Sequence, residues 1–266
     1  HVQVTKASYP PMDQRPIEMV ERKGLGHPDT ICDSVAEELS RALSRYYLEN
    51  CHHILHHNVD KALIVGGRTQ AWFGGGQIVE PIRLILSGRA SVFTEGKQVP
   101  LGRIVLESTR AWLRENLPHL PENGIIIDYL IRPGSVELCK IVEAAGEAPL
   151  ANDTSLGVAH APLSETEQLV LAVEKMVREF EQIGQDVKVM ALRHDDTIDV
   201  TIAAAFIASL TPSAEVYMDV KREVAEKVKA MAAEVTSRQV NVWVNTADIP
   251  EEDTYYLTVT GTSAEA

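Results

Sequence analysis

The sequence predicts an α+β fold made of two similar layered units. The predicted order helix, strand, strand, helix, strand occurs twice in the 266 residues, displaced by roughly 110 to 135 residues, as in an internal repeat. Short strand pairs alternate with crossover helices, which favours mixed sheets with helices on one face. We therefore divide the chain into a first repeat, residues 1–149, and a second repeat, residues 150–266. A chance similarity of element order is the alternative.

The first repeat begins with an extended arm followed by a helix. Apolar residues at Ile31, Val35, Leu39 and Leu43 recur on one face and predict a helix over residues 30–48. A second amphipathic pattern predicts another helix at residues 103–117. β-Branched runs predict the strands, and glycines the turns between them: strands at 61–65, 82–87 and 124–131, and turns at 66–67 and 74–76.

The second repeat opens with a capping box. Ser164 and Glu167 have the spacing at which each side chain bonds to the other residue's backbone amide, which predicts a helix from there to about Phe180. The remaining expected elements are strands at 187–192, 197–207, 240–245 and 255–260, and a long helix at 213–235.

Charge and composition exclude several classes of partner. With 25 Lys plus Arg against 38 Asp plus Glu, the formal charge is −13, which argues against nucleic-acid and anionic membrane surfaces. An acidic chain can bind a polyphosphate through a divalent metal held by carboxylates, together with a few local cations. The 45% of hydrophobic residues supply a sizeable core.

The cysteines and the N-terminal residues indicate a reducing, cytoplasmic setting. Cys32, Cys51 and Cys139 are far apart and lack the CxxC spacing, so neither a disulfide framework nor a zinc site is indicated. The first residues contain no apolar core of signal-peptide length, and no run of about 18 apolar residues occurs. We expect neither secretion nor membrane insertion.

Residues 20–34, VERKGLGHPDTICDS, form the stretch best suited to a phosphate group. Gly24 and Gly26 allow close approach of the backbone, and a helix N-terminus offers free N–H groups and partial positive charge. We expect the helix to begin at Asp29, with the Asp29 side chain as its cap and Pro28 fixing the entry. The stretch is neither a P-loop nor the dinucleotide fingerprint.

Two interpretations of this stretch remain open. His27 and Asp29 can bind a phosphate oxygen and a metal ion, respectively, or they can be a surface histidine and a plain helix cap. For the four histidines at positions 52, 53, 56 and 57 we favour a structural role, because strand geometry would splay the pairs and no carboxylate or cysteine completes a ligand set.

Three further polar positions have both a functional and a structural interpretation. Asp153, in a turn at residues 149–157, can contact a cationic group or a metal, or simply form an Asx turn. The turn at residues 132–137 follows a strand end, where ligand contacts are common, although turn chemistry alone explains its proline and glycine. Lys188 lies among apolar strand residues and either points to solvent or reaches a buried anion.

Several sequence blocks resemble the archaeal-type S-adenosylmethionine synthetases, also called methionine adenosyltransferases. The GHPD tetrad within residues 20–34 is also found in the bacterial and eukaryotic branch, whereas HHN and LANDTS mark the archaeal branch. The blocks cover nearly the whole chain in order: residues 20–34, 56–58, 73–76, 86–90, 149–155, 161–167, 186–190 and 256–265.

The resemblance implies that methionine sulfur attacks C5′ of ATP and expels triphosphate, which is hydrolysed to pyrophosphate and phosphate. His27 would stabilise the bridging oxygen of the leaving triphosphate, Asp29 would hold Mg²⁺, and Lys188 would contact the phosphates. Asp153 would border the methionine and ribose region. K⁺ is a second candidate ion.

The resemblance also implies an ATP-binding turn and an oligomer. Residues 132–137 match a segment assigned to ATP binding in archaeal members. The resemblance therefore implies that ATP is contacted by Arg132, Gly134, Ser135 and Glu137. The family fold has three similar α+β domains around a pseudo-threefold axis, with segments exchanged between domains. Active sites lie between paired subunits, so we expect a homodimer or a dimer of dimers.

The sequence departs from the family pattern at two places. It stops at Ala266, where the archaeal pattern continues into a GDDG and arginine-rich motif, so we expect the third segment to be missing. Thr30 and Arg68 replace a lysine and a methionine-contacting glutamate of the bacterial branch. A non-catalytic homologue that binds nucleotide or pairs with another subunit is the alternative to a synthetase.

Overall fold

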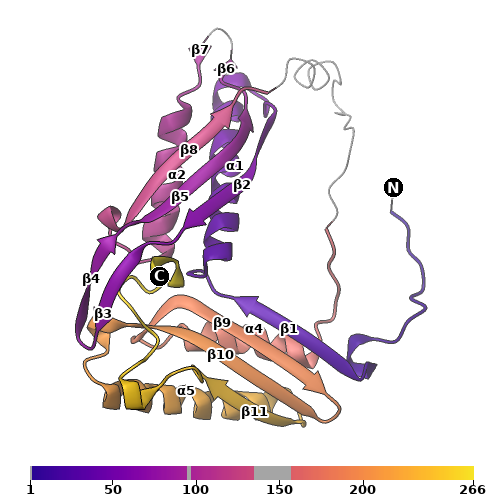
Figure 1. Ribbon diagram of the computed structural model, residues 1–266. Coiled ribbons are helices and arrows are strands. Elements are labelled where there is room, and N and C mark those ends of the chain that lie inside the picture. Colours follow the sequence, from indigo (N-terminus) through magenta and orange to yellow (C-terminus); the bar gives the residue numbers. More distant parts are fainter. Residues whose placement is uncertain (1, 95–96, 135–156) are drawn as a thin grey trace.

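A computed structural model of the chain describes residues 2–94, 97–134 and 157–266. Two layered units are arranged at an angle to each other, each with a sheet covered on one face by two long helices (Figure 1). This arrangement confirms the predicted α+β class with mixed sheets. The predicted boundary between residues 149 and 150 lies outside the described residues and stays a prediction.

The first unit has a three-stranded sheet in the order β2-β5-β8. Strand β2 is antiparallel to β5, and β5 is parallel to β8, with a helix in the crossover. Buried Leu39 and Leu43 of the first helix belong to the same hydrophobic core as Leu84 and Leu86 of the central strand. The elements are α1 (Pro28–Cys51), β2 (His57–Val65), β5 (Ile82–Ala90), α2 (Leu101–Asn116) and β8 (Ile125–Arg132), with the short strands β6 (Phe93–Thr94) and β7 (Lys97–Gln98).

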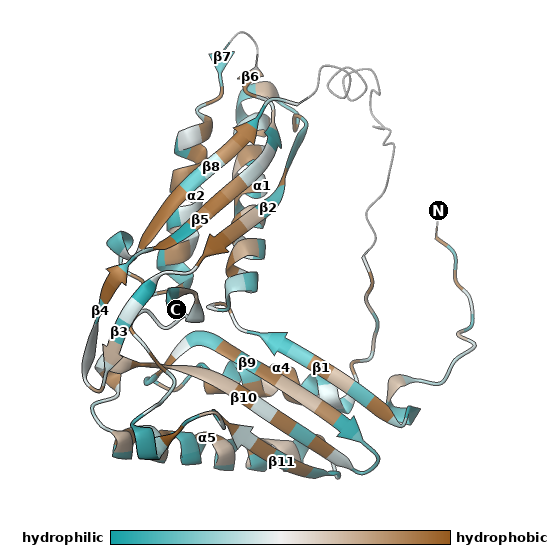
Figure 2. Cartoon of the chain, in the orientation of Figure 1, coloured by the Kyte–Doolittle hydropathy of each residue, from teal (hydrophilic) through white to brown (hydrophobic). Residues whose placement is uncertain are grey.

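The second unit is built on a five-stranded sheet. Strands β9 and β10 form an antiparallel hairpin, and β10 runs parallel to β11 across a helix crossover. Apolar and polar residues alternate along these strands, so one face packs against the helices (Figure 2). The elements are α4 (Glu165–Val177), β9 (Ile183–His194), β10 (Thr197–Ile207), α5 (Ala214–Val235), β11 (Gln239–Val244) and β12 (Leu257–Thr258). The last strand is shorter than predicted.

A strand from the start of the chain completes the second sheet. Strand β1 (Ile17–Lys23) pairs antiparallel with β9, although the sequence predicted only an extended arm there. A second unpredicted element is the hairpin of β3 (Arg68–Trp72) and β4 (Gly75–Glu80). Its tight turn contains Gly74 in the left-handed region, at φ +85°.

Short 3₁₀ turns occupy several connections and both terminal regions. They are η1 (Met12–Gln14), η2 (Glu122–Gly124), η3 (Ala208–Leu210), η4 (Pro250–Glu252) and η5 (Ser263–Glu265). Within the described ranges, no helix combines the length and the apolar character that a membrane span needs.

The helix starts show one prediction confirmed and one that was wrong. The capping box of Ser164 and Glu167 is present in both directions at the start of α4. The first long helix begins at Pro28 instead of Asp29, and its cap is the side chain of His27. Because proline lacks an N–H and suits the first helical position, the helix starts before Asp29 and the cap falls on the residue preceding the proline.

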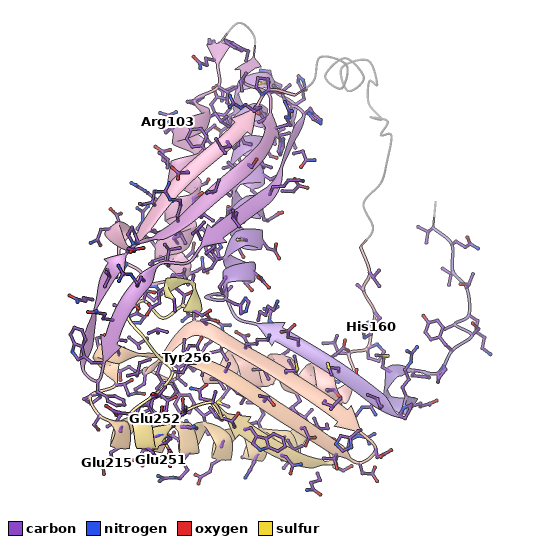
Figure 3. All side chains as sticks on the ribbon, viewed as in Figure 1. Arg103, His160, Glu215, Glu251, Glu252 and Tyr256 are labelled. Atoms are coloured by element: carbon purple, nitrogen blue, oxygen red, sulfur yellow. The ribbon has the colours of Figure 1, made fainter. Side chains whose placement is uncertain are left out.

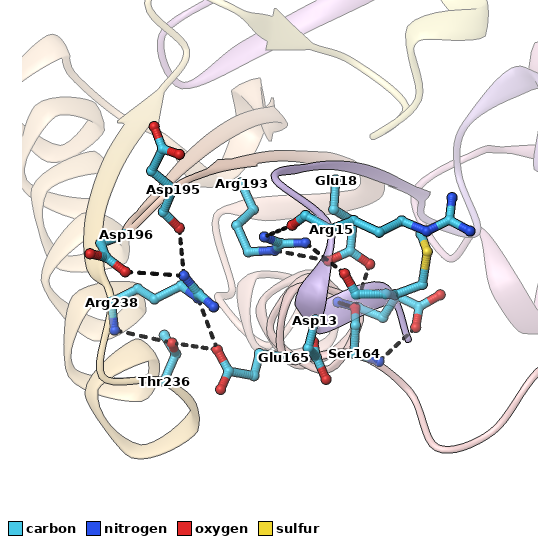
Figure 4. Close-up of polar contacts among 12 residues, drawn as sticks. Asp13, Arg15, Glu18, Ser164, Glu165, Arg193, Asp195, Asp196, Thr236 and Arg238 are labelled. Carbon is cyan, nitrogen blue, oxygen red and sulfur yellow. Dashed lines mark hydrogen bonds and ion pairs between the residues drawn. The ribbon is translucent and has the colours of Figure 1, made fainter. Parts of the chain in front are cut away.

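A buried ion pair anchors the outer end of β1 (Figure 4). Arg193 of β9 lies 3.3 Å from Glu18, and both side chains are almost completely buried. Ser164 donates a hydrogen bond of 2.6 Å to the same carboxylate. The other guanidinium nitrogens donate to the carbonyls of Arg15 (2.8 Å) and Met12 (3.0 Å), so Arg193 joins the arm, β1 and β9.

Candidate functional site

The loop between β1 and α1 lies directly on β9. The amide of Gly24 donates to the Val187 carbonyl at 2.7 Å, and the amide of Gly26 donates to the Gln185 carbonyl at 2.8 Å. A Cβ atom on Gly26 would lie 2.5 Å from the amide nitrogen of Asp186. Position 26 therefore requires glycine, because the backbone of β9 approaches too closely to leave room for a side chain.

Gly26→Ala should consequently displace the loop and destabilise the protein. Backbone atoms cannot yield as a side chain can, so we expect the free energy of unfolding to fall by about 1–3 kcal/mol. Thermal or urea unfolding measures the change. Gly157→Ala is the control, because a Cβ there meets nothing within 4 Å. Equal stability of the two variants would show that the loop tolerates a shift away from β9.

His27 is oriented by its role as the helix cap. Its Nδ1 atom accepts a hydrogen bond of 3.2 Å from the backbone amide of Asp29, and its side chain is 19% exposed. Because Nδ1 is the acceptor, the proton of the neutral ring is on Nε2. The Nε2–H group of the imidazole can thus donate a hydrogen bond to a ligand oxygen.

Four charged side chains gather beside His27. Lys188 of β9 lies 2.5 Å from Glu21 of β1, and Lys23 of β1 forms an ion pair with Asp29. The hydrogen bond from Lys188 lowers the pKa of Glu21, and the hydrogen bond from Lys23 lowers the pKa of Asp29. Both carboxylates are therefore ionised at neutral pH, and Lys188 reaches a partly exposed carboxylate rather than a buried anion.

Residues 261–266 support the other side of the loop. Thr262 donates its hydroxyl to the Gly26 carbonyl at 2.5 Å, and the amide of Ser263 donates to Asp186 at 2.7 Å. Buried Glu265 accepts from the amides of residues 259 and 260 and from the hydroxyl of Thr69. Tyr256, labelled in Figure 3, leads into this segment, and burial raises the pKa of its hydroxyl.

A surface pocket of about 610 Å³ opens beside Asp29. The first turns of α1, the end of β2 and the C-terminal residues line it, including Asp33, Cys32 and Ser263. Its position between the helix N-terminus and the last residues of the described chain gives a ligand access to Asp29.

The carboxylate of Asp29 fits Mg²⁺ as a single ligand. In the part of the chain that the structure describes, no group of three or more His, Cys, Asp or Glu side chains could hold a metal ion. Magnesium usually keeps several waters and is bound through one or two carboxylates plus substrate phosphates, so an exposed lone carboxylate suits an ion that arrives with a polyphosphate.

The predicted site residues fall into two separated groups. His27, Asp29 and Lys188 lie together. Arg132, in contrast, lies opposite Arg89 at the far end of the first sheet, and Gly134 is two residues further along the chain. The neighbouring Ser91 carbonyl accepts from Tyr47, near the end of α1.

The rise of α1 gives the scale of this separation. From Pro28 to Tyr47 the helix rises roughly 28 Å at 1.5 Å per residue, so Arg132 and His27 do not meet within one chain. Ser135, Glu137 and Asp153 lie outside the described residues.

The sequence analysis missed Glu21 and Lys23 as site residues. Both lie on the exposed face of β1, and only the pairing of β1 with β9 places them beside Lys188. The signal that was available is the run of three charged residues, Glu21, Arg22 and Lys23, shortly before the GHPD tetrad.

Comparison with known proteins identifies the family. The S-adenosylmethionine synthetase (AdoMet synthetase) family model matches residues 1–266. The S-adenosylmethionine synthase of Pyrococcus furiosus is 48% identical, over 96% of this chain and 66% of its own length. That of Hyperthermus butylicus is 46% identical, over 100% of this chain and 68% of its own length.

A solved structure agrees in fold. The structure of an unusual S-adenosylmethionine synthetase from Campylobacter jejuni matches with a TM-score of 0.54 at 10% identity, covering 94% of this chain and 61% of that one. The chain spans about 66% of the length of its Pyrococcus furiosus relative. On the match of the family model and these relatives, the chain belongs to the S-adenosylmethionine synthetase family.

Proposed function

We propose that the protein synthesises S-adenosylmethionine from ATP and L-methionine, with hydrolysis of the triphosphate to pyrophosphate and phosphate. The observation that carries this proposal is the cluster of His27, Lys188 and a helix N-terminus on one loop in a chain of net charge −13. Local cations in an acidic protein suit a polyphosphate. Family membership and the names of the relatives support the same reaction.

The site residues have distinct roles in this reaction. The Nε2–H group of His27 donates to the bridging oxygen on which negative charge develops as the C5′–O bond breaks. Lys188 moves from Glu21 to the phosphates and neutralises their charge. When bound, Mg²⁺ supplies further neutralisation, and Asp29 would hold it. In-line displacement by sulfur needs positioning and electrostatic stabilisation and no covalent nucleophile of the protein.

We propose that the active unit is a homodimer, or a dimer of dimers, with the site between subunits. The sheet faces opposite the helices carry apolar side chains that are more than half exposed: Ile17 and Met19 at 63%, Leu63 at 57% and Leu130 at 58%. A second subunit packed against these sheet faces would bring its own Arg132 and Gly134 toward His27. Within one chain these residues are far from His27. Ser135, Glu137 and Asp153 are proposed as further ligand contacts.

The proposal extends to the cofactors and the compartment. Mg²⁺ is the proposed cofactor, and K⁺ is a second ion to test by omission. We place the protein in the cytoplasm, which its widely spaced cysteines support.

Methionine-dependent turnover tests the proposed function. The complete protein with MgATP and methionine should form S-adenosylmethionine, seen by chromatography, and release equal amounts of phosphate and pyrophosphate. Omitting methionine should abolish adenosyl transfer. ATP binding without any product would instead favour a non-catalytic nucleotide-binding or subunit-pairing homologue.

A further inference from the structure

Two lysines face each other across the β1–β9 ladder beside His27. Lys23 and Lys188 are directly opposed partners in the antiparallel register. Opposed side chains lie on the same face of a sheet, and like charges in such a pair are destabilising. The pair is therefore costly unless anions compensate it, and in the ligand-free protein each lysine has its own carboxylate.

The two compensating carboxylates come from different elements. Glu21 lies on the same strand as Lys23 and pairs with Lys188, whereas Asp29 lies in the first turn of α1 and pairs with Lys23. Each carboxylate also interacts electrostatically with the other lysine and with His27. The five groups thus form one cluster with three basic and two acidic members.

The Lys23–Asp29 pair is exposed enough to exchange. The side chains are 31% and 62% exposed, respectively, and ion pairs near solvent contribute little to stability. A lysine has a flexible four-carbon stem, so its ammonium group can move without the backbone moving. The same carboxylate is the one that suits a magnesium ion arriving with phosphates.

We propose that Lys23 is a second phosphate-binding lysine. In the ligand-free protein it pairs with Asp29, and on ligand binding it leaves Asp29 and pairs with a polyphosphate oxygen. The exchange frees Asp29 for the divalent cation that accompanies the phosphates. This inference rests on the proposed function, because it assigns one more contact to the same triphosphate site. It also predicts that Lys23 favours the polyphosphate but opposes a divalent cation that arrives alone.

The test uses the complete protein and two probes that require no turnover. Inorganic tripolyphosphate binding is measured by calorimetry without metal, and Mn²⁺ binding is measured alone by electron paramagnetic resonance. Lys23→Met keeps the length of the side chain and removes its charge. It should weaken tripolyphosphate binding about tenfold, the effect of losing one charge-assisted hydrogen bond. It should strengthen Mn²⁺ binding several-fold, because Asp29 loses its competing cation.

Three further variants separate this exchange from a general effect of charge. Lys188→Met should weaken tripolyphosphate binding but change Mn²⁺ binding less than Lys23→Met, since Lys188 pairs with Glu21. Lys61→Met removes a lysine that pairs with Asp60 on the exposed edge of β2, and it should change neither. Lys23→Arg retains the charge and should keep most of the tripolyphosphate affinity, which provides a second reading if Lys23→Met unfolds.

Each remaining outcome overturns the inference. Unchanged tripolyphosphate binding by Lys23→Met would mean that Lys23 does not contact the phosphates. Weaker or unchanged Mn²⁺ binding would mean that Lys23 does not compete for Asp29. Absence of S-adenosylmethionine formation by the unmodified protein would remove the proposed function, whereas the two binding measurements would still decide the role of Lys23.

Discussion

Replacing His27 with alanine should lower kcat for S-adenosylmethionine formation by about 10²–10³-fold, the usual effect of removing one preorganised donor to a developing anion. The imidazole is a preorganised donor, because the Asp29 amide holds its Nδ1 atom and its side chain is mostly buried. KM for methionine should change little, since the lost bond is made to the leaving group. Steady-state kinetics of the complete protein measure both constants.

Two control variants separate chemistry from helix capping. Alanine at an N-cap also destabilises a helix by about 1 kcal/mol, whereas asparagine caps well. His27→Asn should therefore retain the melting temperature and remain slow. His160→Ala removes a half-exposed histidine that bonds to Glu167 at 2.9 Å, and it should turn over normally. Unchanged turnover by His27→Ala would refute the role assigned to the imidazole.

Arg193→Met should lower the free energy of unfolding by about 3–5 kcal/mol, because removal of one partner leaves the other charge buried and unpaired. Glu18 would keep only the Ser164 hydroxyl, and the carbonyls of Met12 and Arg15 would lose their donor. Urea unfolding followed by circular dichroism measures the change. The variant should also release the arm from β9.

Matched variants show whether burial is the cause. Arg222→Met breaks an exposed pair with Asp219 and should cost less than about 1 kcal/mol. The double variant Glu18→Leu with Arg193→Met should regain part of the loss, because replacing both charges removes the unpaired carboxylate. A cost for Arg193→Met as small as that for Arg222→Met would show that water reaches Glu18.

Most of the regular elements could be predicted because their apolar residues follow the period of a helix or a strand. β10 was predicted at its observed limits, and α1, α2 and α5 to within a few residues at each end. β1 was missed for a physical reason. Its buried face includes Glu18, whose charge is compensated only by Arg193 from a distant strand, so its sequence lacks the apolar alternation of a half-buried strand.

The candidate site was predictable only in part. The glycines and the helix start indicated an anion-binding loop and made His27, Asp29 and Lys188 candidates, and the resemblance assigned their roles. Lys23 and Glu21 could not be found in this way, because their role depends on a register between strands about 165 residues apart. The Asp29 cap was wrong because Pro28 occupies the first helical position, which places Asp29 inside the helix and the cap at His27.

The hydrogen bond from Thr262 to Gly26 spans 236 residues, and this has a consequence during translation. A ribosome adding 5–20 residues per second makes the second partner on the order of 10 s or more after the first. During the first part of that interval the GHPD loop on the nascent chain lacks β9, and throughout the interval it lacks the Thr262 hydroxyl. The first helix can form early. The loop that carries its cap, however, obtains its last contact only when Thr262, among the last of the described residues, leaves the ribosome.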